Sequence, residues 1–234
     1  QGFLVATGGT ITTCGNCKIH TFTGPGTFTV NSAACTAANN VVSYMVVAGG
    51  GAGGIGDGGG GGAGGFREYK SPVTPYTASP LNGNPGGTAI TVTAQAYPIT
   101  VGAGGTVSNG PAAGGNGNPS VFSTVTSTAG GGSPNNTSPP FNGNPGGSGG
   151  GGGGNGPPAG TTTGGSGNTP PVSPSQGNDG GDGEFICGSH NSGGGGGGAT
   201  AVGTDAGPNP SKDPTSGGFA GGAGATSHIT GSPV

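Results

Sequence analysis

The sequence predicts a protein of β-strands and irregular segments with essentially no α-helix, in which a small antiparallel sheet precedes a bundle of packed polyglycine-II helices. Three observations lead to this prediction. Glycine and proline supply 65 and 21 of the 234 residues, a strong excess over ordinary globular proteins. Only 27% of the residues are hydrophobic, which excludes a large apolar core. Strand-like patterns are concentrated in the first 48 residues, and long glycine runs follow them.

The first 48 residues are expected to form a small β-domain. Valine and threonine are frequent here, and glycine is placed at turns. Within 17–23, Ile19 and Thr21 alternate with His20 and Phe22, as in a strand with one covered face. The predicted strands are 3–6, 10–13, 17–23, 27–30 and 41–47.

Residues 49–234 are expected to form the glycine bundle, with a β-hairpin near 88–101 and one more strand at 121–126. Runs such as 193–198 lack the triplet repeat of collagen, and glycine weakens a β-sheet. The remaining ordered form is the extended helix with three residues per turn and no internal hydrogen bonds. Its N–H and C=O groups point outward, so neighbouring helices must pair with them when they are buried.

Charge and composition exclude several classes of partner. The formal net charge is −3, and Lys18, Arg67, Lys70 and Lys212 are too few and too scattered to form a nucleic-acid-binding face. No stretch reaches the ~20 apolar residues of a membrane span. We therefore expect neither a nucleic-acid partner nor membrane insertion. Gln1 in place of an initiator methionine indicates a fragment or a processed product.

No pattern in the sequence is typical of an enzyme. The histidines stand alone, no nucleophile has a recognisable local signature, and the glycine runs lack the lysine and following helix of a phosphate loop. The acidic segment 179–184 lacks the ligand spacing of a calcium loop and is interpreted as a solvated loop. We expect no catalytic residues, no cofactor and no metal.

Four cysteines, Cys14, Cys17, Cys35 and Cys187, are candidates for structural disulfides. Free thiols and half of a zinc site are the alternatives. A bond from Cys35 to Cys14 or Cys17 would stay within the sheet, whereas Cys187 would tie down a distant loop. Disulfides would suit an oxidising, extracellular setting.

Several segments, in order, resemble the glycine-rich module of tailed-phage tail fibres and tip adhesins. They are Lys18-Ile19-His20-Thr21-Phe22-Thr23, Gly26-Thr27-Phe28-Thr29-Val30, 42–51, 63–67, 98–105 and 117–122. The resemblance covers residues 7–132 and returns at 227–234. It implies a fibre or adhesin in which polyglycine helices form a rigid sandwich and variable loops touch a host receptor. The module carries no cysteine at the positions of Cys14 and Cys17.

Two functions are therefore expected as alternatives. The first is a structural or adhesive component of a phage tail fibre or similar virion appendage, in contact with other fibre subunits or copies of itself and with a host surface receptor. The second is a glycine-rich subunit of a cell-surface filament or extracellular matrix. Aromatic and arginine side chains in connecting segments are the candidate receptor contacts. They are Arg67, Tyr69 and Tyr76 in segment 66–79, and Phe185 and His190 in segment 173–191.

Overall fold

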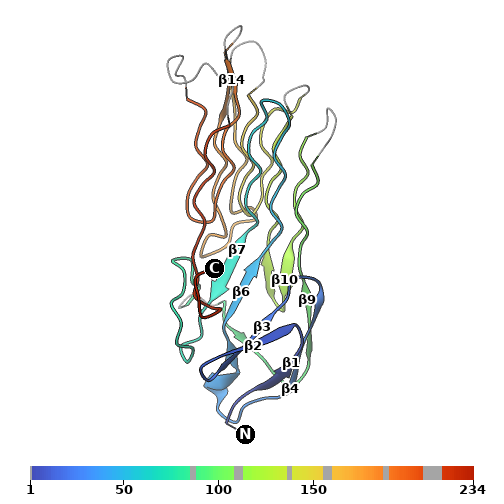
Figure 1. Ribbon diagram of the computed structural model, residues 1–234, viewed down its shortest axis with the longest axis vertical. Coiled ribbons are helices and arrows are strands. Elements are labelled where there is room, and N and C mark those ends of the chain that lie inside the picture. Colours follow the sequence, from blue (N-terminus) through green and yellow to red (C-terminus); the bar gives the residue numbers. More distant parts are fainter. Residues whose placement is uncertain are drawn as a thin grey trace.

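The computed structural model describes residues 2–84, 88–107, 113–135, 139–154, 160–186, 190–207 and 218–234. It is an elongated molecule with two parts along its long axis (Figure 1). β-sheets and the N-terminus occupy one end, and wavy extended runs continue from the sheets toward the other end. Within the described residues the one helix is a 3-10 turn, η1 (Ala37–Asn40). The predicted fold class, mainly β and irregular with essentially no α-helix, is thus confirmed.

The largest sheet has five strands in the order β1-β4-β9-β10-β11, each antiparallel to its neighbours. Its strands are β1 (Val5–Thr7), β4 (Gly26–Ser32), β9 (Ala96–Thr100), β10 (Ser120–Phe122) and β11 (Val125–Ser127). The centre of the sheet is the pairing of β4 with β9, which places Phe28 opposite Tyr97. The sheet therefore contains strands from both sides of the domain boundary that the sequence predicted at residue 48.

The remaining strands form smaller sheets. They are the pairs β2 (Thr10–Cys14) with β3 (Cys17–Thr21), β5 (Val41–Val42) with β8 (Ile90–Thr91) and β6 (Tyr44–Val47) with β7 (Phe66–Tyr69), and the three-stranded β12 (Gly160–Thr162), β13 (Gly183–Ile186) and β14 (His190–Ser192). The hairpin predicted near 88–101 is not formed, because β8 pairs with β5 and β9 pairs with β4 and β10. The segment predicted as one strand at 121–126 is itself a hairpin, β10–β11.

A compact apolar core fills the space between these sheets. Aromatic rings meet at its centre, where Phe122 lies 6.1 Å from Phe28, 6.1 Å from Tyr44 and 6.2 Å from Tyr97, measured between ring centroids. Valine, isoleucine and alanine side chains surround the rings. Edge-to-face contacts of this kind add to the free energy gained by burying the rings.

The glycine runs form a second core, in which the backbone makes the contacts. Within 148–154 every third N–H donates to the same neighbouring run. The donor–acceptor pairs are Ser148–Ala63, Gly151–Gly60 and Gly154–Asp57 for one neighbour, Gly149–Asn178 and Gly152–Gly181 for the second, and Gly150–Asn144 and Gly153–Phe141 for the third, at 2.7–3.1 Å. A repeat of three matches three residues per turn, the predicted polyglycine-II period.

Run 146–154 is surrounded on all sides. Its backbone hydrogen bonds reach six neighbouring runs, 57–65, 129–134, 141–144, 163–168, 178–182 and 193–198. Acceptor numbers fall along the first neighbour and rise along 178–182, so antiparallel and parallel neighbours are mixed. All nine positions of this run are buried. Six neighbours around one run is the hexagonal packing expected of a three-residue helix that bonds in three directions.

Only glycine permits this spacing at the inner positions. A Cβ atom built on Gly151 would overlap the carbonyl oxygen of Gly194, and one built on Gly195 would overlap that of Ala220. These are backbone atoms, which cannot move aside without displacing a whole run. The long glycine runs of the sequence are thus explained by close approach of backbones rather than by flexibility.

Candidate functional site

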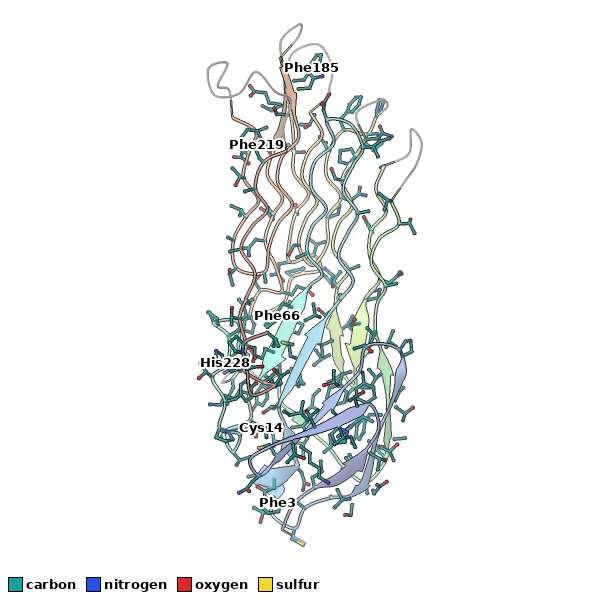
Figure 2. All side chains as sticks on the ribbon, viewed as in Figure 1. Phe3, Cys14, Phe66, Phe185, Phe219 and His228 are labelled. Atoms are coloured by element: carbon teal, nitrogen blue, oxygen red, sulfur yellow. The ribbon has the colours of Figure 1, made fainter. Side chains whose placement is uncertain are left out.

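The residues predicted to contact a receptor lie in two separate places, because segment 173–191 starts beside Phe66 and runs along the bundle to Phe185. Figure 2 places Phe66, the first residue of β7, where the bundle meets the sheets, and Phe185 of β13 near the far end. Phe185 therefore lies too far from the candidates on β7 to share one binding surface with them. Their surroundings also differ.

Arg67 and Tyr69 belong to β7 and are buried, with 8% and 7% of their surfaces exposed. The Tyr69 ring stacks on Tyr44 at 6.0 Å. Burial raises the pKa of Tyr44, against the opposing influences of its hydrogen bond to Thr88 and the charge of Arg67. Arg67 and Tyr69 thus pack inside the molecule and leave little surface for a receptor.

Glu68, between them, organises a buried polar cluster that sequence reasoning did not identify. It is 2% exposed, and its carboxylate accepts hydrogen bonds from the Ser79 N–H at 2.8 Å and the Ser227 hydroxyl at 2.5 Å. Ser227 and Val234 exchange backbone hydrogen bonds and close the C-terminal loop 227–234. Glu68 therefore fixes this loop onto segment 71–84. Glu68 lay in a segment that was predicted to be a loop, where an acidic residue gives no signal of burial.

Tyr76 lies beside this cluster. Its hydroxyl is buried, and among the described residues it has no hydrogen bond of normal geometry. Desolvation, followed by the negative charge of Glu68, raises the pKa of Tyr76 well above its ordinary value. The Lys70 ammonium stands over the ring at 5.8 Å from its centroid. Tyr76 is half-buried and belongs to the packing of segment 71–84.

The far end of the bundle carries the three-stranded sheet β12-β13-β14 (Figure 1). Phe185 is half-buried at the middle of this sheet, opposite Gly160 on one side and Asn191 on the other. The Asn191 amide donates to the Asp57 carboxylate at 3.3 Å, which ties the sheet to the turn of run 57–65. His190 begins β14, and its side chain lies outside what the structure describes.

The acidic residues of 179–184 have a structural role in the bundle. Asp179 accepts from the Gly167 N–H at 2.7 Å, and Asp182 accepts from the Gly164 N–H at 2.9 Å. The two aspartates are three residues apart and therefore meet every third N–H of the adjacent run. Their side chains replace backbone acceptors at the border of the bundle. Within the described ranges no group of three or more His, Cys, Asp or Glu side chains could hold a metal ion.

Two of the four cysteines face each other. Cys14 ends β2, Cys17 begins β3, and their Cα atoms are register partners. Both are free thiols. Cys35 lies between β4 and η1 and is not part of the paired strands of this hairpin. Cys187 lies outside the described residues, so its predicted disulfide stays a prediction.

A cavity of about 310 Å³ separates hairpin β2–β3 from the sheets beneath it. Its lining is mainly apolar and includes Phe22, Phe28, Val46 and Phe122, with Ile229 of the C-terminal loop at one side. His20 lies in this region, with its Nδ1 2.8 Å from the Gly8 carbonyl oxygen.

In the part of the chain that the structure describes, no helix has the length and apolarity to span a bilayer.

Comparison with known proteins gives one match. No curated protein and no solved structure matches the chain significantly. The model of the glycine-rich domain family matches residues 22–233, which begin directly after β3 and include the strands from β4 onward and the glycine runs. The match covers most of the chain, and this protein therefore belongs to the glycine-rich domain family.

Proposed function

We propose that this protein is a structural and adhesive component of a phage tail fibre or similar virion appendage, exposed outside the cell, with receptor contacts at the far end of its glycine bundle. The observation that carries the proposal is the division of the molecule along its length. The N-terminus lies at the sheet end, and Phe185 with the sheet β12-β13-β14 lies at the opposite end.

The glycine bundle supports this proposal as a rigid spacer. Its inner runs expose little besides hydrogen-bonded backbone, which offers few distinctive groups to a partner. Side chains that can recognise a ligand must then lie where runs end and the chain turns. Functional residues on connecting segments held by a rigid scaffold are a common arrangement.

The burial of Arg67 and Tyr69 moves the proposed recognition to Phe185 and its neighbours. Phe185 keeps partial exposure, and sheet β12-β13-β14 and the Asn191–Asp57 contact hold its strand in place. Rigid aromatic groups of this kind lose little conformational entropy on binding and are frequent anchors of interfaces. His190 stays a candidate contact through its position on the adjacent strand.

The test measures binding of the purified, fluorescently labelled chain to host cells of the virion that carries it. Phe185→Ala should lower binding at least tenfold at an unchanged melting temperature. Phe219→Ala is the matched control, because it removes an exposed aromatic ring lower on the bundle (Figure 2). Equal binding by the two variants, or no binding by the parent chain, would contradict the proposed contact.

Immunogold labelling of intact particles separates this function from its alternative. Label at the ends of virion appendages is the expected result. Label on cellular filaments or matrix would instead assign the chain to the glycine-rich structural subunits of cell surfaces.

A further inference from the structure

We infer that Cys14 and Cys17 are a disulfide-forming pair that cross-links hairpin β2–β3 across its turn, to the exclusion of Cys35. The inference depends on the strand register and not on the proposed function. It selects one pairing among those that the sequence left open.

The geometry of the hairpin brings the two thiols together. Strands β2 and β3 pair without a register shift from Thr10 opposite Thr21 to Cys14 opposite Cys17. Directly opposed residues of an antiparallel pair have Cα atoms about 4.5–5.5 Å apart and side chains on the same face. Disulfides span Cα separations of about 4.4–6.8 Å. The register thus places the two Cα atoms within the range of separations that a disulfide spans.

The turn supports this approach. Gly15 has φ 58°, in the left-handed region, and Asn16 is not among the residues of positive φ. This combination is typical of a two-residue type II′ hairpin turn with glycine at its first central position. A Cβ atom on Gly15 would meet nothing within 4 Å, so this side of the turn is open, whereas Cys14 Sγ lies beside Gly231 of the C-terminal loop. A small disulfide reagent can therefore approach the pair.

The surroundings are also suitable for exchange chemistry. Cys14 is exposed and Cys17 is half-buried. The Cys14 thiolate attacks a sulfur of a small disulfide such as oxidised glutathione, forms a mixed disulfide and releases one glutathione thiolate. The Cys17 thiolate then attacks Cys14 Sγ and releases the second. Two cysteine thiols are oxidised, one glutathione disulfide is reduced to two thiols, and the two cysteine protons pass to these products.

The cross-link would act on a part of the molecule that few hydrogen bonds secure. Among the described strands, β2 and β3 pair only with each other. The hairpin is attached by the His20–Gly8 hydrogen bond and by the edge-to-face contact of His20 with Phe28 at 5.0 Å. A disulfide that closes the turn restricts the unfolded hairpin and should slow its local opening.

The experiment uses the full chain with Cys35→Ser and Cys187→Ser, so that Cys14 and Cys17 are the only thiols. After treatment with oxidised glutathione and trypsin, the peptide ending at Lys18 should be two hydrogens lighter, carry no glutathione and resist alkylation. Further replacement Cys17→Ser should trap one glutathione on Cys14. Retention of two glutathiones, covalent dimers, or two thiols that remain open to alkylation would overturn the inference.

If the doubly substituted chain does not fold, the same measurement can be made on the parent chain. Tryptic mapping after the same oxidation should again find the two cysteines linked within residues 1–18. A link from either of them to Cys35 or Cys187 would overturn the pairing.

Discussion

The two cores of this protein differ in the size of the side chains that they accommodate. In the sheet region, Phe28, Tyr97 and Phe122 fill space with large side chains. In the glycine bundle, Gly151 and Gly195 leave no space at all, because the neighbouring carbonyl groups occupy the place of a Cβ atom. The first core is stabilised by apolar surface removed from water. In the second, buried N–H and C=O groups find partners on adjacent runs.

This difference explains how a chain with 27% hydrophobic residues folds at all. The short apolar core holds the strands of the sheets, and the glycine runs continue from those strands. Run 49–54 follows β6, and run 129–134 follows β11. The sheets therefore set the spacing at one end of the bundle, where β6–β7 and β10–β11 are already paired.

The largest expected effect is that of a side chain inside the glycine core. Gly151→Val would push run 193–198 away and break several cross-run hydrogen bonds, each worth roughly 1–3 kcal/mol once its partner is left buried. We expect a loss of more than about 4 kcal/mol, or no folding, in chemical denaturation. Gly207→Ala is the control, because nothing lies within 4 Å of its Cβ position, and it should change stability by less than about 0.5 kcal/mol. Equal stability of the two variants would place Gly151 at a surface.

The removal of a large side chain tests the apolar core. Phe122→Ala removes a ring that contacts three others and should cost about 3–5 kcal/mol, because the cavity refills only in part. Phe122→Leu keeps most of the volume and should cost clearly less. Denaturant midpoints and slopes of the two variants provide the measurement. A negligible loss in Phe122→Ala would mean that the glycine bundle holds the fold without this core.

Gln176 lies where the two cores meet and tests their connection. It is fully buried, accepts from the Thr128 N–H at 2.8 Å and donates to the Pro170 carbonyl at 3.1 Å. Gln176→Leu leaves both groups unpaired and should cost about 2–4 kcal/mol in thermal or chemical unfolding. The exposed Gln95→Leu should change stability by less than about 0.5 kcal/mol. A similar small change at Gln176 would show that water replaces its side chain.

The smallest predicted effect is a loss of stability in alkali. Burial raises the pKa of Tyr76 and Tyr44 above 10.0, so the folded chain keeps protons that the unfolded chain releases. Their contribution is complete below pH 10 and declines above it, by about 1.4 kcal/mol at pH 11 for each tyrosine that stays protonated. Urea unfolding at pH 8 and pH 11 measures this loss, which Tyr76→Phe should reduce. An equal loss in parent and variant would assign it to other groups.

The sequence predicted the kinds of secondary structure better than it predicted which segments lie beside each other. Strand patterns in residues 10–30 located β2, β3 and β4, and the glycine runs, which lack the collagen triplet and weaken a sheet, excluded collagen and ordinary sheets. The sequence did not predict which runs are neighbours, because glycine has no side chain whose size or polarity indicates what packs against it. The register is instead fixed at the borders by polar groups such as Gln176 and Asp182, whose partners are distant in sequence.

The candidate site was predictable to a smaller extent. Arg67 and Tyr69 follow a glycine run and looked like loop residues, but they belong to strand β7 and are buried. Their burial depends on the pairing of β7 with β6, where Tyr69 stacks on Tyr44, and the local sequence does not indicate this pairing. Phe185 was located in a connecting segment from the same local signals, and there the strand β13 keeps it partly exposed.

Residue-by-residue amide hydrogen exchange within 148–154 tests the glycine core most directly. In a three-residue helix with six neighbours, consecutive N–H groups donate to three different runs, so Gly149, Gly150 and Gly151 should all be protected to a similar free energy of opening. Protection that alternates between neighbouring residues would indicate a β-strand at a sheet edge. Exchange at the rate of an unstructured peptide would contradict the glycine core altogether.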